Sequence, residues 1–590
     1  DEVGELLRDV ASAISIAVIV SLFVSVLALP SLAARFLSTR AQEQREAERR
    51  GKTLRVDEGL SARARAGIGR QVAWLCRSSW RALVVVVASV TGSVVLALAL
   101  LPPMEYLPTG NRNLVFGILS PPPGYSVGEV ERMGVALQAK VAEHVEAEVD
   151  GVPAIRRSFF VGDPNQIFCG AAAVDPANAL ALAAYYRQQQ AGVPGSFGFA
   201  SQASLFGNRL GGGRAVELDI SGSDLRLLVG AGTTLMATIR ERIPGAQVRP
   251  LPSLELGAPE LHVVPRRSET AGLGLGGAEL GQAVDVMVDG AIIGEWGPAG
   301  ERKLNVVLRG VTRAAAEDPS RSTDTKLSAT ELAAIPLTTP SGEVVPLGTL
   351  AEVDEQLGPT LIRRIERERA ITLQITPPED LALETAMIEI RAIVDELGQA
   401  EALPGVDIRI AGTAGKLEQA KARFGEVLLL AVVIIYLLLA ALYEDFLAPI
   451  VVLVTVPMAA AGGVLGLLAA GLLAPQAFDL ITAVGFLILI GVVVNNAILV
   501  VDGALARLRE GAMLVPAVAG AVERRVRAIF MATLTSLAGL VPMVVMPGAG
   551  SELYRGVGAI VLGGLALSTV LTIYVVPALF TVMWRIRGVR

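Results

Sequence analysis

Seven long apolar stretches constrain this sequence more than any other feature. None of them contains Asp, Glu, Lys, Arg or His, and each is close to the length, about 20 residues, that a helix needs to cross the hydrocarbon core of a bilayer. Backbone polar groups find no water there, and a helix satisfies them within one segment. We therefore expect a membrane protein with an α-helical transmembrane bundle of seven spans, at residues 13–34, 82–101, 427–442, 447–473, 480–501, 528–546 and 557–583.

Basic residues give the orientation of these spans. Residues 35–81 carry twelve Lys or Arg and residues 504–527 carry five, whereas the two loops after the fourth and sixth stretches together hold only Arg555. Since Lys and Arg accumulate in cytoplasmic loops, the two basic segments are expected in the cytoplasm, together with the C-terminus. Residues 102–423 then lie on the other side of the membrane, and their length of about 320 residues suffices for two or three domains.

The extramembrane region repeats one pattern three times. Each copy has an alternating apolar strand, a turn, an amphipathic helix and a second strand, which is typical of βαβ-type units that pack helices on one face of a sheet. The copies begin "NLVFGILSPPPGYSVGEVERM", "RAVELDISGSDLRLLV" and "AITLQITPPEDLALETAM". We expect two small α+β domains, an inserted, more β-rich lobe at 257–347, and a rigid strand-to-helix turn at "PPPGY".

The membrane region also contains a repeat. At a constant offset of 547, eight of 36 aligned positions are identical, and Pro30 and Pro577 fall at the same depth of two spans with the same expected direction. Internal repeats of this kind are common in transporters. The first span is therefore expected to end a repeat whose beginning is not in this sequence.

The motifs of most enzymes are missing from the sequence. It has no G-x-x-x-x-G-K-[ST] phosphate loop and no G-x-S-x-G nucleophile turn, and its one formal dinucleotide motif opens no βαβ unit. The two histidines form no ligand cluster for zinc, and the two cysteines are expected on opposite sides of the membrane. The formal dinucleotide motif is made of Gly272, Gly274 and Gly277, the histidines are His144 and His262, and the cysteines are Cys76 and Cys169. A net charge of -6 argues against nucleic acid as a partner. Because the motifs of enzymes and the ligand cluster of a zinc site are missing as well, we expect a transporter that is not an enzyme and has no cofactor or metal.

Asn495 and Asn496 stand side by side within the fifth apolar stretch, in "GVVVNNAILVVDG". A polar group in hydrocarbon must find a partner, so polar residues of the spans are expected to face other helices. Two interpretations stay open for the amides: packing hydrogen bonds worth about 0.6–2 kcal/mol, or a role in ion coupling. Amides do not titrate, so proton coupling would need ionisable residues outside these spans. The polar residues concerned are Asn495, Asn496, Thr482, Thr533, Thr535 and Ser536.

Five motifs resemble, in order, the hydrophobe/amphiphile efflux branch of the resistance-nodulation-division superfamily. They are "EYLPTGNRNLVFGILSPPPGYS", "LYEDFLAPIVVLVTVPMAAAGGVLG", "GVVVNNAILVVD", "RRVRAIFMATLTSLAGLVPMVVMPGAGSE" and "YVVPALF". The resemblance covers essentially the whole chain and implies the C-terminal half of a proton-driven pump for drugs or other amphiphilic solutes. It also implies a homotrimer in the inner membrane of a Gram-negative bacterium. Its expected partners are a periplasmic adaptor protein, an outer-membrane channel, membrane lipid and the N-terminal half of the same chain.

The resemblance also assigns a part to each segment, with a periplasmic porter region of ferredoxin-like βαβ subdomains. The expected parts are the last span of a first repeat (1–37), a cytoplasmic linker (38–80), a span (81–103), a first porter subdomain (104–209), a second porter subdomain (210–256 and 348–415), a docking-type insert (257–347) and a five-span bundle (416–590).

By resemblance, the proton relay of the superfamily corresponds to Asn495, Asn496, Arg525 and Thr533. This chain departs from well-studied drug pumps at two positions, with Asn495 in place of a relay lysine and Ala532 in place of a relay threonine. An amide cannot supply the counter-charge of a lysine, so a relay here would rest on hydrogen bonds, and the pKa of its carboxylates would be set differently. Arg525 is equally compatible with a topology anchor at a cytoplasmic helix end.

The resemblance also points to a substrate cleft in the porter region. The segment "FFVGDPNQIFCG" falls near a flexible loop that lines this cleft in drug pumps, which makes Phe168 a candidate apolar contact. Packing within its own domain is the alternative for this side chain. Two other functions stay open for the chain: the same superfamily with a lipid or export-assisting cargo, and a membrane receptor or scaffold that transports nothing.

Overall fold

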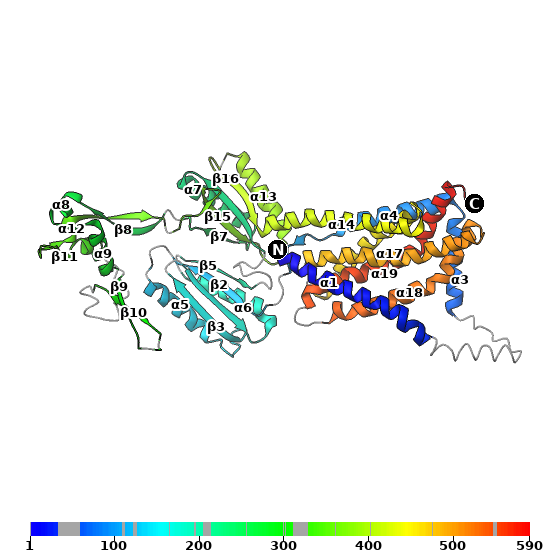
Figure 1. Ribbon diagram of the computed structural model, residues 1–590, viewed down its shortest axis with the longest axis horizontal. Coiled ribbons are helices and arrows are strands. Elements are labelled where there is room, and N and C mark those ends of the chain that lie inside the picture. The colour runs from blue at the N-terminus through cyan, green and yellow to red at the C-terminus, as the bar shows by residue number, and fades with distance from the viewer. Residues whose placement is uncertain are drawn as a thin grey trace. The chain divides into compact units, whose positions relative to one another are not determined.

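The computed structural model divides the chain into two compact units (Figure 1). One contains residues 1–102 and 424–590 and holds the apolar helices, and the other contains residues 103–423 and holds most of the strands. The structure describes all residues except 1, 34–59, 109–111, 122–124, 126, 164–165, 194–195, 204–213, 255–256, 289, 299, 301, 311–327, 360, 402, 475, 547–550 and 590. Most of the predicted linker 38–80, the centre of the predicted "PPPGY" turn and part of the predicted insert therefore lie outside the described residues.

Seven of the described helices are long and apolar enough to cross a membrane, and they lie where the sequence predicts the seven spans. This agreement supports a multi-pass membrane protein. The helices in and around these spans are α1 (Glu2–Phe23) with the π-helical turn η1 (Val24–Ala28), α3 (Leu60–Cys76), α4 (Ser79–Leu100), α14 (Thr413–Tyr443), α15 (Ala448–Leu453), α16 (Thr455–Leu473), α17 (Leu480–Arg509), α18 (Leu514–Val545) and α19 (Ser551–Ile586).

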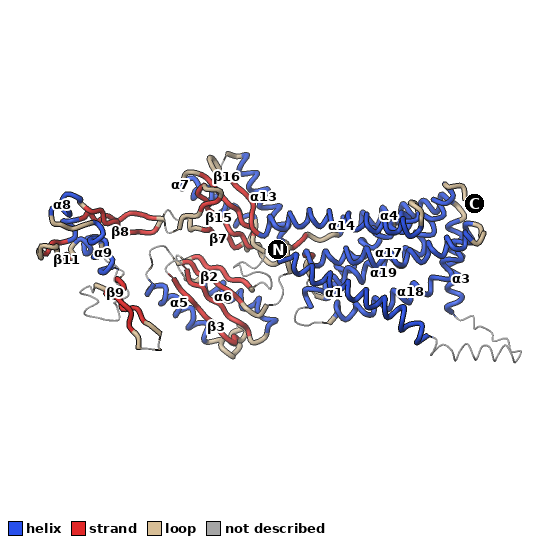
Figure 2. Tube along the Cα trace, in the orientation of Figure 1, coloured by secondary structure: helices blue, strands red, loops and turns tan. Residues whose placement is uncertain are grey.

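Helix α19 packs against α16, α17 and α18 and forms the centre of the bundle (Figure 2). In its membrane-spanning part 61% of the residues are buried, against 56% for α15 and α16 together and 50% for α17. The corresponding share is 17% in α18 and 6% in α14. Since an apolar helix in a bundle buries the faces that meet other helices, α14 and α18 each present a wide face that no described residue covers.

The first sheet of the other unit is antiparallel, with the strand order β3-β4-β2-β5. Helix α5 packs at Phe160 of β3, where Gly134 makes room for the ring, and α6 packs at Gly117 of β2, where the side chain of Gln190 takes the space of a Cβ. The register places these two positions on one face of the sheet, so both helices cover the same side. The elements are β2 (Val115–Ser120), α5 (Val127–Ala142), β3 (Ile155–Asp163), β4 (Gln166–Ala173), η2 (Pro176–Asn178), α6 (Ala179–Ala191) and β5 (Phe197–Gln202).

The second sheet has the order β14-β15-β6-β16, and β7 pairs with β15 as well. Buried apolar residues of α7 and α13 recur at helical spacing and form one face of each helix. The three predicted strand–helix–strand sequences are confirmed in both sheets. The elements are β6 (Val216–Gly222), α7 (Leu225–Arg242), β7 (Gln247–Leu251), β14 (Arg364–Ile365), β15 (Glu368–Thr376), α13 (Leu383–Gln399) and β16 (Asp407–Gly412). Two further strands have two residues each: β1 (Met104–Glu105) follows α4, and β17 (Phe478–Asp479) precedes α17.

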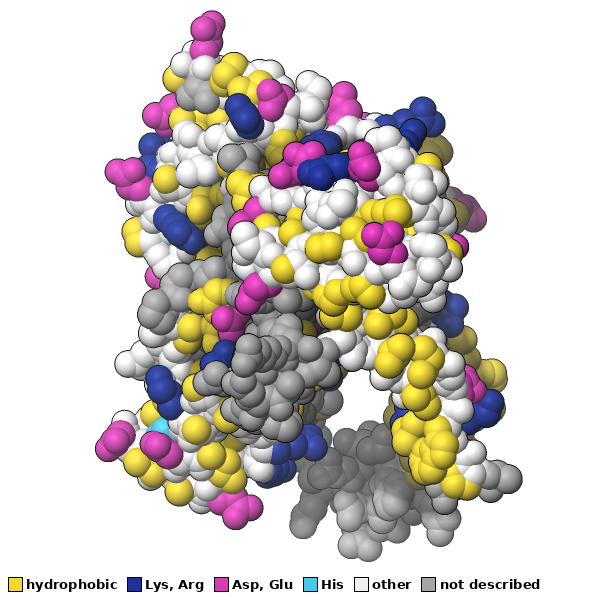
Figure 3. All heavy atoms as spheres, turned by 90° about the vertical axis from the view of Figure 1, so that its left-hand side faces the viewer, with side chains coloured by type: hydrophobic (Ala, Val, Ile, Leu, Met, Phe, Trp, Pro, Cys, Tyr) yellow, Lys and Arg dark blue, Asp and Glu magenta, His cyan; other side chains and the backbone are white. Residues whose placement is uncertain are grey.

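The segment between the second and third copies begins and ends with one long ladder, β8 (Ala258–Pro265) against β13 (Ala351–Gly358). A small core that includes Leu280, Leu332 and Leu347 holds the elements between them together. Helices contribute as much as strands, so the prediction of a more β-rich lobe is only partly met. On the face of the chain in Figure 3, charged side chains of both signs lie among hydrophobic ones. The remaining elements are α8 (Arg267–Gly272), α9 (Gly277–Val288), β9 (Ala291–Trp296), β10 (Leu304–Leu308), α11 (Ala329–Ala333), β11 (Pro336–Thr338), β12 (Val344–Pro346) and α12 (Leu347–Leu350).

Candidate functional site

Asn496 is the centre of a buried polar triad in the helix bundle. Its side-chain nitrogen Nδ2 donates to Oγ1 of Thr533 at 3.3 Å and to Oγ1 of Thr569 at 3.2 Å, and the two hydroxyl oxygens lie 3.1 Å apart. The three side chains come from α17, α18 and α19, and none is more than 6% exposed. A polar group buried among apolar residues is stable only when it is hydrogen-bonded. The triad therefore ties three helices together at one level of the bundle.

Asn495 points away from this triad. Consecutive residues of a helix project about 100° apart, and the side chain of Asn495 is exposed, as are Gly491, Val492 and Asp502 on the same side of α17. The prediction that both amides face other helices holds for Asn496 and is wrong for Asn495 within the described residues. The physical reason is that no described helix covers this side of α17.

Arg525 also lies outside the triad. It is exposed on α18 beside Gly503 of α17. Gly503 is seven residues from Asn496, which corresponds to about 10 Å along the axis of α17. Further along α18, Thr535 is exposed and donates its hydroxyl to the Met531 carbonyl at 2.8 Å, and Ser536 is exposed as well. The prediction that Thr535 and Ser536 face other helices is therefore wrong for the described residues, because most of α18 is uncovered.

The sequence reasoning missed Thr569, the third member of the triad. The signal was available, because Ser568, Thr569 and Thr572 are polar residues within the seventh apolar stretch, and all three are buried in α19. A hydroxyl in such a stretch must find a partner. Of the four residues that the resemblance assigns to a relay, the structure brings together Asn496 and Thr533.

Phe168 lies on strand β4, with Ile118 and Val161 as its cross-strand neighbours. Its ring packs against Phe116, with centroids 5.4 Å apart, and against Phe159 at 5.6 Å. These three half-buried rings occupy the sheet face opposite α5 and α6, and we call them the phenylalanine cluster. Strands β3 and β4 are regular up to residues 164 and 165, which lie outside the described residues, so Phe168 itself stands on a strand, and its contact with a substrate stays a prediction.

Two arginines, one from helix α7 and one from strand β7 of the second sheet, border this face. The Arg240 guanidinium lies over the Phe197 ring, 5.8 Å from its centroid, and Arg249 Nη2 donates to Gln166 Oε1 at 3.4 Å. Burial lowers the pKa of Arg249, which stays cationic at neutral pH because the pKa of an arginine starts far above it. The sheet face opposite α5 and α6 therefore combines aromatic rings with positive charge at its border.

Cys169 belongs to the opposite, helix-covered face, although it is next to Phe168 in sequence. Gln190 Nε2 donates to its sulfur at 3.5 Å. Burial raises the pKa of the Cys169 thiol to about 11, and the Gln190 hydrogen bond offsets part of this rise. Since the thiolate is the metal-binding and reactive form, Cys169 is a poor metal ligand and a poor nucleophile at neutral pH.

This environment predicts very slow alkylation of Cys169. A rise of the pKa from 9.0 to about 11 lowers the thiolate fraction at pH 8 about 100-fold, and burial slows attack further. We expect N-ethylmaleimide at pH 8 to modify Cys169 at least about 100-fold more slowly than a cysteine introduced by Val161→Cys, whose position is exposed. Peptide mass spectrometry of the folded protein would measure both rates, and equal rates would contradict the buried position of Cys169.

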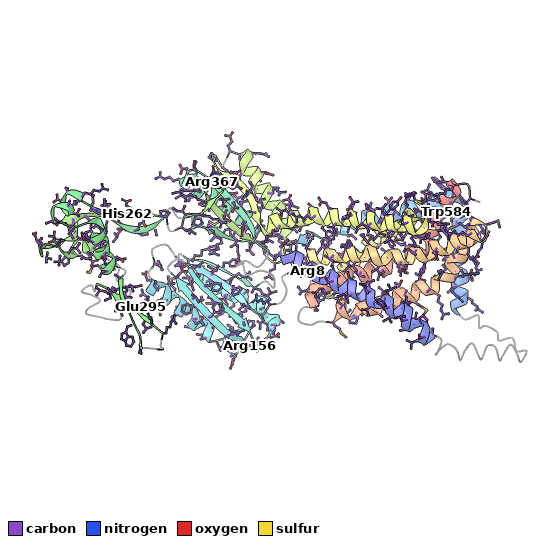
Figure 4. The ribbon with its side chains drawn as sticks, in the orientation of Figure 1. Arg8, Arg156, His262, Glu295, Arg367 and Trp584 are labelled. Carbon is purple, nitrogen blue, oxygen red and sulfur yellow. The ribbon has the colours of Figure 1, made fainter. Side chains whose placement is uncertain are left out.

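The two histidines do not share a site. His144 is buried against Tyr185, with ring centroids 4.9 Å apart. His262, labelled in Figure 4, lies on β8, and its Nε2 is 2.9 Å from Glu260 Oε1. Among the residues that the structure describes, no three His, Cys, Asp or Glu side chains are placed to hold one metal ion. The insert also carries an exposed pair, Glu295 with Lys303, at 2.7 Å.

Comparison with known proteins identifies the family of this chain. The profile of the AcrB/AcrD/AcrF family matches residues 1–584. The chain therefore belongs to the AcrB/AcrD/AcrF family, which confirms the resemblance to the resistance-nodulation-division superfamily.

Solved structures of a heavy metal efflux pump share the fold. One crystal form superposes with a TM-score of 0.73 at 21% sequence identity and covers 89% of this chain and 52% of the pump. A second crystal form gives a TM-score of 0.70 at 22% identity and covers 88% of this chain and 51% of the pump. The chain thus spans about half the length of these pumps.

Proposed function

We propose that the chain is the C-terminal half of a proton-motive-force-driven efflux pump. Family membership and seven apolar helices support a membrane transporter. In the proposed assembly a homotrimer lies in the inner membrane of a Gram-negative bacterium, with residues 103–423 as its periplasmic porter and docking region and the C-terminus in the cytoplasm. It works with a periplasmic adaptor protein and an outer-membrane channel.

The phenylalanine cluster carries the proposal that the cargo is a drug or another amphiphilic solute. Half-buried rings on the sheet face opposite α5 and α6 offer contact to an apolar molecule, and the bordering Arg240 and Arg249 offer charge to a polar end. A metal cargo, as named for the pumps of similar fold, would be held by a group of suitable ligands. The phenylalanine cluster presents apolar rings, which suit an organic molecule, and this observation favours the organic cargo.

The uncharged triad leads to a proposal for proton coupling. Asn496 and Thr533 cannot change charge, so in our proposal they hold α17 in position, and the titrating groups lie outside the seven spans. The exposed amide of Asn495 is the contact that we propose for those groups. Arg525, exposed about 10 Å away along the helix axis, then serves as a cytoplasmic anchor or as a more distant member of the relay.

Phe168→Ala tests the proposed cargo. Removing the ring takes away aromatic contacts worth about 0.5–1.5 kcal/mol, so the half-saturating concentration of a lipophilic anionic dye, whose charge complements Arg240 and Arg249, should rise about 2- to 12-fold. The measurement is dye efflux from cells that produce the complete pump, with its abundance determined by immunoblot.

Trp296→Ala is the matched control, since Trp296 is an exposed aromatic residue on the separate β9–β10 hairpin. Dye efflux by this control should equal that of the wild type. If Phe168→Ala transports the dye with unchanged half-saturation, the cluster does not contact an amphiphilic cargo. Transport of a phospholipid in place of the dye would support the lipid-cargo alternative, and a complete protein that moves neither would support a receptor or scaffold.

A further inference from the structure

The chain passes between its two compact units at two places. One is the Pro102–Pro103 peptide, which lies between the end of α4 at Leu100 and strand β1. The other is the Arg423–Phe424 peptide within α14, which is one continuous helix from Thr413 to Tyr443. A movement of the membrane-spanning part of α4 or α14 reaches the strand-rich unit along the backbone through these two crossings.

The first crossing is fixed by a buried ion pair. Glu105 accepts from Arg214 through both carboxylate oxygens, Oε1 from Nη2 at 2.9 Å and Oε2 from Nε at 3.2 Å. The two side chains are only 8% and 9% exposed. Bidentate pairs of this kind fix direction as well as distance. Glu105, two positions after Pro103, is thereby held to Arg214, which lies two residues before strand β6.

The same carboxylate reaches the first residue of helix α13, and the same guanidinium reaches the backbone two residues before it. Glu105 Oε1 also accepts from the Leu383 backbone N–H at 2.9 Å, and Arg214 Nη2 donates to the Leu381 carbonyl at 2.7 Å. Leu383 is the first residue of α13, so Glu105 satisfies one of the backbone N–H groups that a helix start leaves without an intrahelical partner. The pair therefore joins the first crossing to the first turn of α13.

The second crossing is also tied to the first turn of α13. Glu384 Oε2 accepts from the Met104 backbone N–H at 2.6 Å, and Glu384 Oε1 accepts from Nζ of Lys421. Lys421 lies in α14, two residues before the second crossing. Glu384 thus holds both crossings at once, one through the backbone and one through a side chain.

We propose that Glu105, Arg214, Glu384 and Lys421 are positioning residues that form a coupling joint, through which movement of α4 and α14 reaches the second sheet. The inference rests on the proposed transport function. Helix α13 can transmit such a movement because Ala386, Ile390 and Ile393 are buried along one of its faces. Interiors pack at the density of organic crystals and transmit strain. A shift of the first turn of α13 therefore moves the elements packed on that face.

The two ion pairs allow coupling to be separated from folding. Loss of either partner of the buried Glu105–Arg214 pair leaves an unpaired buried charge, which destabilises the fold strongly. The Lys421–Glu384 pair is partly exposed, with side chains 45% and 25% accessible, and exposed pairs contribute little to stability. Lys421→Ala should therefore disturb the joint and leave the protein folded.

The experiment uses the complete pump in proteoliposomes with a fluorescent amphiphile and an imposed proton gradient. We expect Lys421→Ala to lower the maximal transport rate about 5- to 10-fold and to leave the half-saturating concentration and the melting temperature unchanged. Lys421→Arg keeps the charge and should retain at least half of the wild-type rate. Arg409→Ala removes an exposed pair with Glu366 in the same sheet and should transport like the wild type.

A second measurement reports on the joint without transport. Spin labels at Ile388 of α13 and Gln419 of α14, both exposed positions in the same compact unit, should give a narrow distance distribution in the wild type and one at least twice as wide in Lys421→Ala. Wild-type transport together with an unchanged distribution in Lys421→Ala would overturn the coupling joint. If the wild-type protein does not transport the amphiphile, the proposed function fails, and the distance measurement alone decides whether the joint exists.

Discussion

Gly563→Val is expected to prevent the central helices from packing and to remove most folded protein from the membrane. A Cβ atom at Gly563 would lie 2.3 Å from the Gly462 carbonyl oxygen and 2.5 Å from the Gly466 Cα atom. Both are backbone atoms of α16, so no side-chain rotation can relieve the overlap. Small residues four apart let transmembrane helices approach closely, and Gly462 and Gly466 provide this surface for α19. Overpacking typically costs about 1–3 kcal/mol, and contact with backbone places Gly563→Val at the upper end.

The amount of monodisperse protein after detergent extraction measures this effect. Gly471→Val is the matched control, since Gly471 lies in α16, the helix that Gly563 of α19 contacts, and a Cβ at Gly471 would meet no atom within 4 Å. The control should extract and melt like the wild type. Wild-type yield and melting temperature for Gly563→Val would mean that α16 and α19 do not meet at these glycines.

The membrane-spanning helices could be predicted from the sequence because the signal is local. A run of about 20 apolar residues without a charge has few other stable forms. The neighbours of each helix are a different matter, since the order of spans along a chain does not specify which faces meet. Asn496 shows the limit: its need for a partner was predictable, but Thr569, 73 positions away, was not identified as that partner.

The phenylalanine cluster could have been predicted in part. Alternation places Phe159 and Val161 on one face of a strand, and Phe168 and Gly170 on one face of the next, so a two-residue connection at 164–165 brings these rings to the same side. By contrast, Glu105 and Arg214 are separated by 109 positions, and nothing in either neighbourhood indicates the other. Long-range ion pairs of this kind depend on the tertiary fold.

Asn495→Ala and Asn496→Ala are expected to fail in different ways. Asn496→Ala removes two buried hydrogen bonds to Thr533 and Thr569, and although the two hydroxyls still contact each other, stability should fall by about 1–2 kcal/mol. Asn495 is exposed and bonds nothing in the triad. If its amide meets the titrating groups of the complete pump, Asn495→Ala should lower proton-driven transport more than about 10-fold, which corresponds to a loss of about 1.4 kcal/mol in the coupled step.

Transport rate and melting temperature, measured together on the complete pump, separate the two roles of the amides. Val492→Ala is the control for the exposed side of α17, because Val492 lies about one turn from Asn495 on the same uncovered side and has no polar atom in its side chain. Unchanged transport by Asn495→Ala would exclude its amide from coupling. A normal melting temperature for Asn496→Ala would show that the triad adds nothing to stability. A loss of transport confined to Asn495 would locate coupling on the side of α17 that the described helices leave open.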